Sequence, residues 1–197
     1  LVALAALWAL LVRATRDGVR RLMVVLGSGG HTGEMLYLME GARLSCFETL
    51  FVVYASSDTL SRQRFEAFAA GRAELAGVCL VYLPIPRPID VHDGYLRALP
   101  KFAHSVTITA LRLAALLRIS HFVCNGPGTC IPPLLMLALK RRLLGHATRI
   151  VFVESFCRVT GLSLSGKIAR PFTDDFVVHW EALHARVPGS KYLGFLF

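Results

Sequence analysis

The stretch Val24-Val25-Leu26-Gly27-Ser28-Gly29-Gly30-His31-Thr32-Gly33 places a short apolar run directly before a glycine-rich turn. Glycines let backbone N–H groups approach an anion closely, and a helix that follows adds the positive end of its dipole. The stretch therefore predicts a strand, a turn and a helix of an α/β protein, with a phosphate site at the turn. Its spacing argues against a nicotinamide or flavin site, because Thr32 stands where a third glycine is expected and no acidic residue follows at Tyr54 or Ala55.

Apolar runs of strand length alternate with helical periodicity along the rest of the chain. We expect strands at 22–26, 50–54, 78–83, 121–124, 150–153 and 176–178, with one more near Tyr192, and helices at 31–44, 57–71, 95–118 and 131–144. Runs that are apolar throughout indicate strands buried on both faces, as in a mostly parallel sheet covered by helices. The fold class is therefore α/β, with a single Rossmann-like doubly wound sheet over residues 21–197. The prolines of 84–90 predict a loop.

The composition fits one domain with a membrane anchor. A chain of 197 residues with 54% hydrophobic content can bury one substantial core. Residues 1–12 are continuously apolar and predict part of a transmembrane anchor, and residues 13–20 form a basic juxtamembrane linker. Basic residues after the span favour a cytosolic domain, and they argue against a signal peptide, whose basic residues precede the apolar run.

The net charge of +9 indicates an anionic partner, either a phosphorylated substrate or an acidic lipid surface. Nucleic acid fits poorly, because no nucleic-acid-binding motif is present. The expected helix at 95–118 combines apolar and basic residues, which suits either a membrane interface or a helix packed on the core. No metal site is predicted, and the five cysteines, which form no C-x-x-C pair, are interpreted as reduced thiols, several of them buried.

Four segments are expected to end strands on the side where α/β proteins bind ligands: 27–32, 84–90, 125–129 and 154–158. The segment Asn125-Gly126-Pro127-Gly128-Thr129 is a second glycine-containing turn before a helix. Two such turns can hold a diphosphate, although each can also be a tight turn that simply requires glycine.

His31 and Glu154 are the candidate acid–base residues. An imidazole, whose ordinary pKa is about 6.5, can accept a proton from a hydroxyl as a general base, or it can have a structural role at a helix start. Glu154 ends an expected strand and can act as an acid or base, or can pair with Arg158 in a structural salt bridge.

The ordered set of motifs resembles a known family, the membrane-anchored subunit of the two-subunit UDP-N-acetylglucosamine transferase that makes dolichyl-diphosphate chitobiose. The resemblance covers nearly the whole chain and rests on six segments: Gly27–Thr32, Ile85–Arg87, Cys124–Cys130, Val153–Arg158, Leu164–Lys167 and Tyr192–Gly194.

This resemblance implies an endoplasmic reticulum membrane protein whose cytosolic domain is the acceptor-side half of a GT-B glycosyltransferase. A soluble catalytic partner would carry the UDP-N-acetylglucosamine site, so that no cofactor is bound by this chain. The resemblance also implies an inverting transfer to a lipid diphosphate-linked sugar. The residues expected to bind that acceptor are Ser28, Gly29, Gly30, His31, Thr32, Arg87, Asn125, Gly126, Gly128, Thr129 and Arg158. The residues expected to bind the partner are Tyr192, Leu193, Gly194, Phe195, Leu196 and Phe197.

Two other functions fit the same features. The chain could act only as a scaffold that anchors the catalytic partner, with structural glycine turns. It could also be a subunit of a split polysaccharide glycosyltransferase that uses another donor sugar. A stand-alone nucleotide-binding enzyme fits less well, because a two-lobed glycosyltransferase needs two such domains and this chain has material for one.

Overall fold

The computed structural model describes residue 18 and residues 20–89, 95–114 and 118–194. The expected anchor at 1–12 lies outside these residues, as does nearly all of the expected linker at 13–20. None of the helices in the described ranges is both long and apolar enough to cross a membrane.

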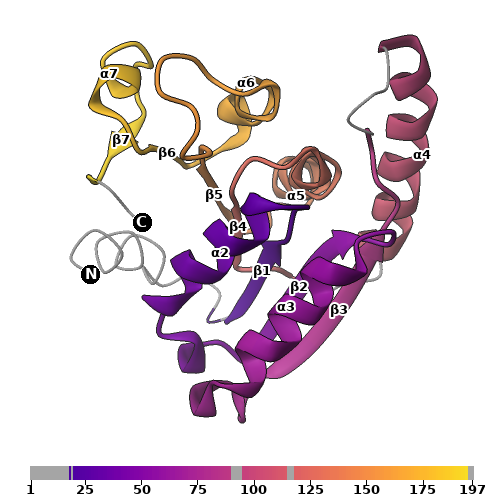
Figure 1. The fold of residues 1–197 in the computed structure, drawn as a ribbon. Coiled ribbons are helices and arrows are strands. Elements are labelled where there is room, and N and C mark those ends of the chain that lie inside the picture. Colours follow the sequence, from indigo (N-terminus) through magenta and orange to yellow (C-terminus); the bar gives the residue numbers. More distant parts are fainter. Residues whose placement is uncertain (1–17, 19, 90–94, 115–117, 195–197) are drawn as a thin grey trace.

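The centre of the molecule is a seven-stranded sheet in which every neighbouring pair of strands is parallel (Figure 1). The strands are β1 (Arg21–Val25), β2 (Thr49–Ala55), β3 (Cys79–Ile85), β4 (His121–Cys124), β5 (Arg149–Val153), β6 (Asp175–Val178) and β7 (Lys191–Tyr192). The prediction of a Rossmann-like parallel sheet is confirmed, and each strand overlaps a range expected from its apolar run.

The strand order is β3-β2-β1-β4-β5-β6-β7. The chain thus builds outward from β1 in one direction and then returns to β1 to build in the other. This reversal makes the carboxyl ends of β1 and β4 a topological switch point, which is where open α/β sheets bind their ligands. Both glycine turns follow these two strands, so the topology brings them together.

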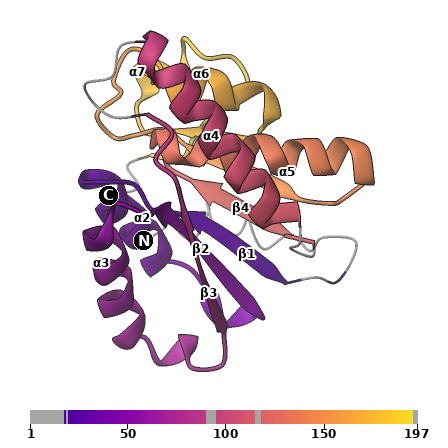
Figure 2. The same cartoon turned by 90° about the vertical axis from the view of Figure 1, so that its right-hand side faces the viewer.

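Helices cover both faces of the sheet (Figures 1 and 2). The helices are α2 (Gly30–Glu40), α3 (Thr59–Ala70), α4 (Tyr95–Ala114), α5 (Ile131–Leu144), α6 (Leu164–Ala169) and α7 (Glu181–His184). Successive strand residues face opposite sides. On β1, Leu22 and Val24 therefore join the core under α2 and α3, whereas Met23 and Val25 join the core under α4 and α5.

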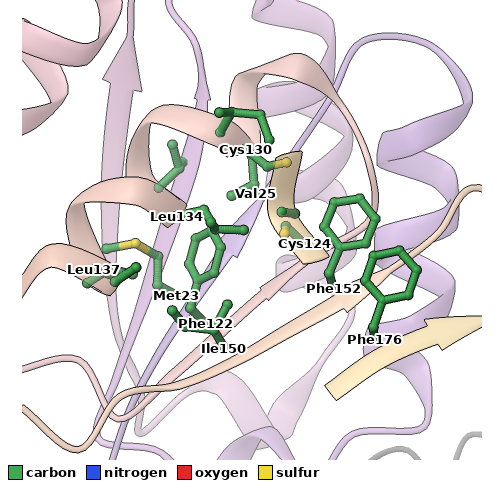
Figure 3. Close-up of a cluster of buried hydrophobic side chains, with 14 of the residues drawn as sticks. Met23, Val25, Phe122, Cys124, Cys130, Leu134, Leu137, Ile150, Phe152 and Phe176 are labelled. Carbon is green, nitrogen blue, oxygen red and sulfur yellow. The ribbon is translucent and has the colours of Figure 1, made fainter. Parts of the chain in front are cut away.

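The second of these cores is drawn in Figure 3, where Leu134 and Leu137 of α5 lie over Met23 and Phe122 of the sheet. Next to them the rings of Phe152 and Phe176 stack with centroids 5.1 Å apart. This packing fixes the start of α5, and with it the turn that precedes the helix.

Two details differ from the sequence-based expectation. The first helix ends at Glu40 instead of residue 44, because Gly41 caps it with a backbone hydrogen bond to Met39. Pro84, expected in a loop, lies within β3 and pairs with Tyr54. A proline is tolerated there because β3 is an edge strand, whose outward N–H groups need no partner.

Helix α4 packs on the core along one side. Leu113 is buried, and the Ser105 hydroxyl donates a 2.6 Å hydrogen bond to the Pro86 carbonyl. The opposite side of the helix exposes Leu99 and Leu111, at 68% and 66%, among exposed basic residues such as Lys101. The core-packed interpretation thus holds for one face of α4, and the other face keeps the basic and apolar character that suits an anionic lipid surface.

Candidate active site

The two glycine turns are packed directly against each other at the switch point of the sheet. A Cβ atom on Gly27 would lie only 2.4 Å from the Cβ of Pro127 and 2.9 Å from the Cβ of His31. Gly27 is therefore required by close packing between the first turn and the second. The two turns form one unit, as expected for segments that hold a single ligand.

The N-terminus of α2 is open to solvent. The helix begins at Gly30, after Gly29 at φ 70° and ψ −128°, a conformation that favours glycine. Ser28, Gly29 and Gly30 are exposed, and among the described residues no side chain caps this end of the helix. The first backbone N–H groups of α2 are thus available to an anion, and the helix dipole favours one at this position.

Thr32 supports the first turn from beneath. It is fully buried, and its hydroxyl donates a 2.6 Å hydrogen bond to the Gly27 carbonyl and also lies 2.9 Å from the Ser61 hydroxyl. Asp58 caps α3 by accepting hydrogen bonds from the backbone N–H and the hydroxyl of Ser61. The Thr32 side chain is therefore used within the protein, and only its backbone N–H remains for an anion.

Asn125 joins the second turn to the first helix. Its Nδ2 donates a 2.6 Å hydrogen bond to the His31 carbonyl and a 3.2 Å hydrogen bond to Oε2 of Glu34. These two acceptors fix the orientation of the amide. The side chain is fully buried, so its Nδ2 has a positioning role, and a diphosphate would meet the backbone of this turn instead.

The rest of the second turn includes Gly126, which has φ 98°. Gly126 and Thr129 are buried, whereas Gly128 is exposed. A Cβ on Gly126 would lie 3.7 Å from Oε1 of Glu154, Cε1 of His31 and the backbone nitrogen of Ser155. The glycine thus lies between the two candidate acid–base residues that the sequence identified.

Glu154 is buried and its carboxylate is already hydrogen-bonded. Oε1 accepts from the Ser155 backbone N–H, while Oε2 accepts from the backbone N–H and the hydroxyl of Ser163. Its side chain is 1% exposed, so in the described structure it contacts these groups and not Arg158. The Glu154 carboxylate thus joins the two ends of the loop 155–163 through Ser155 and Ser163.

Glu34 and His179 belong to the same cluster, and the sequence pattern singled out neither as a site residue. Oε1 of Glu34 accepts a 3.2 Å hydrogen bond from the Ser155 hydroxyl, and its Oε2 lies 3.5 Å from Nδ1 of His31. The one local signal was the spacing of three residues from His31 to Glu34, which places both on one side of a helix.

His179 follows β6 and is 1% exposed. Burial lowers its pKa from 6.5 to about 4, although the negative charge of Glu34 and a hydrogen bond with the backbone of Glu154 oppose this effect. His179 is therefore neutral at physiological pH, and its ring packs near Phe156, with centroids 5.9 Å apart.

The two expected arginines lie at the edge of this region. Arg87 follows β3 and is half-buried, whereas Arg158 is exposed in the loop 155–163. Residues 157–162 of that loop line a hollow of about 250 Å³. The structure places both arginines in loops after carboxyl ends of strands, as the sequence predicted.

The expected partner-binding residues lie at the end of the chain. Lys191 of β7 forms an ion pair with the buried Asp175, which also binds Arg149 at 2.6 Å. This buried pairing anchors the last strand. Tyr192 is 36% exposed and Leu193 packs on the α2 side of the core, while Phe195, Leu196 and Phe197 lie outside the described residues.

A family model described as "Oligosaccharide biosynthesis protein Alg14 like" matches residues 22–196 of the chain, including every segment of this site. The chain belongs to the Alg14-like family. No solved structure significantly matches the chain.

Three relatives illustrate the similarity, and each is named UDP-N-acetylglucosamine transferase subunit ALG14. The protein of Eremothecium gossypii is 39% identical over 188 residues, which are 92% of this chain and 82% of the relative. The human protein is 36% identical over 178 residues, covering 88% of this chain and 81% of the relative. The Candida albicans protein is 33% identical over 176 residues, covering 89% of this chain and 78% of the relative.

The packing of Gly27 predicts that Gly27→Ala destabilises this Alg14-like chain. The added methyl group would overlap the Pro127 ring, so we expect the free energy of unfolding to fall by about 1–3 kcal/mol. Denaturant unfolding measures this change. The matched control is Gly33→Ala, because nothing lies within 4 Å of a Cβ there, and we expect its stability to be equal or higher by up to about 1 kcal/mol. Equal stability of Gly27→Ala and the parent chain would contradict the packing of the two turns.

Proposed function

We propose that this chain is the acceptor-binding, membrane-anchoring subunit of a UDP-N-acetylglucosamine transferase. The enzyme would add the second N-acetylglucosamine to dolichyl-diphosphate-N-acetylglucosamine during N-glycan precursor synthesis. Membership in the Alg14-like family supports this function, as do the names of the relatives. The observation that carries the acceptor-binding part is the open N-terminus of α2, packed against a second glycine turn at the switch point of a single sheet.

The donor site belongs to the soluble partner in this proposal. A GT-B enzyme places its two substrates between two Rossmann-like domains, and the described residues form one seven-stranded sheet. The acceptor diphosphate would bind the first backbone N–H groups of α2 and the backbone of the second turn. Arg87 and Arg158 would neutralise part of its charge from the surrounding loops.

His31 would act as the general base. The acceptor hydroxyl attacks the anomeric carbon of the donor sugar, a new C–O bond forms, and the bond to UDP breaks with its electron pair leaving on the diphosphate. The hydroxyl proton passes to the imidazole of His31. Attack opposite to the leaving group inverts the anomeric centre.

The chain would act at the cytosolic face of the endoplasmic reticulum as a single-pass protein. Residues 1–12 would supply the anchor, and the exposed face of α4, with Leu99, Lys101 and Leu111, would contact anionic lipid. The apolar residues at the end of the chain would dock on the soluble subunit. The anchor, the lipid contact of α4 and the docking of the soluble subunit would together hold the active site next to the lipid-linked acceptor.

Transfer of radiolabelled N-acetylglucosamine to lipid diphosphate-N-acetylglucosamine tests the proposal. We expect product only when the chain and the soluble subunit are combined, and none from either alone. Activity of the chain alone would overturn the division of the two sites. Full activity of the soluble subunit tethered by an unrelated membrane anchor would show that this chain is a scaffold only. Preference for another sugar nucleotide would contradict the proposed donor.

A further inference from the structure

Glu34 connects the three segments that form the site. It lies one helical turn after His31 on α2, and its side chain is 16% exposed. Oε2 accepts a hydrogen bond from Asn125 of the second turn and faces Nδ1 of His31 at 3.5 Å. Oε1 accepts a hydrogen bond from Ser155 of the loop that follows β5.

The carboxylate of Glu34 is held in its charged form. Burial alone would raise its pKa, but the His31 imidazole beside it, together with hydrogen bonds from Ser155 and the Phe156 backbone, lowers it below its ordinary value of 4.5. An anionic oxygen therefore faces the imidazole at neutral pH. Such an oxygen accepts a proton donor and attracts a positive charge.

The nitrogen of His31 that faces Glu34 is Nδ1. Nδ1 is buried and has no hydrogen-bond partner in the described structure, since its 3.5 Å contact with Oε2 is long for an N–H···O bond. Catalytic hydrogen bonds are often long in the free protein and shorten in the complex with substrate. With Nδ1 covered, Nε2 is the nitrogen left to exchange a proton with a substrate.

We propose that Glu34 is a positioning residue that fixes the tautomer and orientation of His31 for proton transfer. This inference rests on the proposed function, in which His31 is the base. Glu34 would hold the neutral ring with its proton on Nδ1, so that the lone pair of Nε2 faces the acceptor hydroxyl. When Nε2 takes the proton, the carboxylate of Glu34 stabilises the imidazolium that forms. Asn125 completes the arrangement, because its amide bonds to both the His31 carbonyl and Glu34.

Other titratable groups face this pair. Glu154 approaches His31 across Gly126, and the neutral His179 lies behind Glu34 at the end of β6. Substituting Glu34 leaves both of these groups in place, so the effect of its own charge can be separated from theirs.

The test is Glu34→Gln in the reconstituted two-subunit enzyme. We expect kcat to fall about 10-fold or more, which is part of the 10²- to 10⁴-fold that a general base contributes, with little change in the KM of the lipid acceptor. We also expect the pH–rate profile of Glu34→Gln to differ from that of the parent enzyme, because the variant lacks the charged group beside the proposed base. Glu34→Asp keeps the charge, so it should restore most of the parent profile.

Two control variants separate positioning from structural support. Ser155→Ala removes the loop contact of Glu34 but keeps its charge next to His31, so its pH–rate profile should match that of the parent enzyme. Glu40→Gln removes an exposed carboxylate from the last turn of the same helix and should behave like the parent enzyme. Identical pH profiles for Glu34→Gln and Ser155→Ala would overturn the proposal.

A readout that does not need transferase activity distinguishes this inference from the proposed function. In the ¹⁵N-histidine spectrum of the full chain at pH 8, we expect neutral His31 to carry its proton on Nδ1, and the signal to be assigned by its loss in His31→Ala. In Glu34→Gln, a mixture with the Nε2-protonated tautomer should appear. An Nε2 proton in the parent chain would contradict the positioning role, even if the enzyme is active. An inactive pair with the expected tautomer would instead contradict the proposed function.

Discussion

We expect replacement of His31 with alanine to lower the kcat of the proposed two-subunit transferase by about 10²- to 10⁴-fold, the range that a general base contributes. The loss reflects the position of the ring at the meeting point of both glycine turns, beside the anion of Glu34. Stability should change little, because the side chain is 31% exposed and the bond from Asn125 goes to the His31 backbone carbonyl.

Steady-state kinetics of the reconstituted two-subunit enzyme measures the change in kcat. Thermal unfolding of the variant measures any change in stability. The matched control is His146→Ala, which changes a histidine just before the amino end of β5, whereas the site lies beyond the carboxyl ends of the strands. Added imidazole should restore part of the activity of His31→Ala by occupying the vacated space. Full turnover of a His31→Ala enzyme that assembles normally would remove His31 from the mechanism.

The sheet was predictable from the sequence because a strand buried on both faces must be apolar throughout. For example, the apolar run Ile150–Val153 was expected to be a strand. The observed strand β5 has the same end and begins one residue earlier, at Arg149. Helices α6 and α7 were not predicted, because six and four residues are too few to display a helical period. Helix α6 depends instead on its cap, in which the Ser163 hydroxyl accepts from the Gly166 N–H.

The candidate site was predictable only where its signal was local. Glycine turns after apolar strands identified Gly27 and Gly126, and the strand order then brought these turns together, as expected for a switch point. The roles of Glu34, Glu154 and His179 depend on which side chains meet across α2, β5 and β6. No spacing along the chain encodes those contacts, so the sequence could name Glu154 as a candidate acid or base but not the hydrogen bonds that hold its buried carboxylate.

Acidification should destabilise the chain through His179. In the unfolded chain this group titrates near 6.5, whereas in the folded chain its pKa is about 4. Between these values the unfolded state binds more protons, so stability is complete above about pH 6.5 and decreases as the pH falls toward 4. The difference between the two pKa values lowers the free energy of unfolding by about 3 kcal/mol at pH 4 relative to pH 7. Glu34, whose pKa is lowered, adds a further loss only below about 4.5.

Denaturant unfolding at a series of pH values between 7 and 4 measures this loss, and His179→Gln identifies its origin. Glutamine is uncharged at every pH and retains a donor that can reach the Glu154 backbone, so the variant should lose most of the pH dependence between 6.5 and 4.5. His104→Gln, which changes an exposed histidine of α4, should keep it. If the free energy of unfolding of His179→Gln depends on pH as strongly as that of the parent chain, other groups cause the acid sensitivity. If His179 is its source, protonation at this position introduces a charge directly behind Glu34, and activity should fail in acid together with the fold.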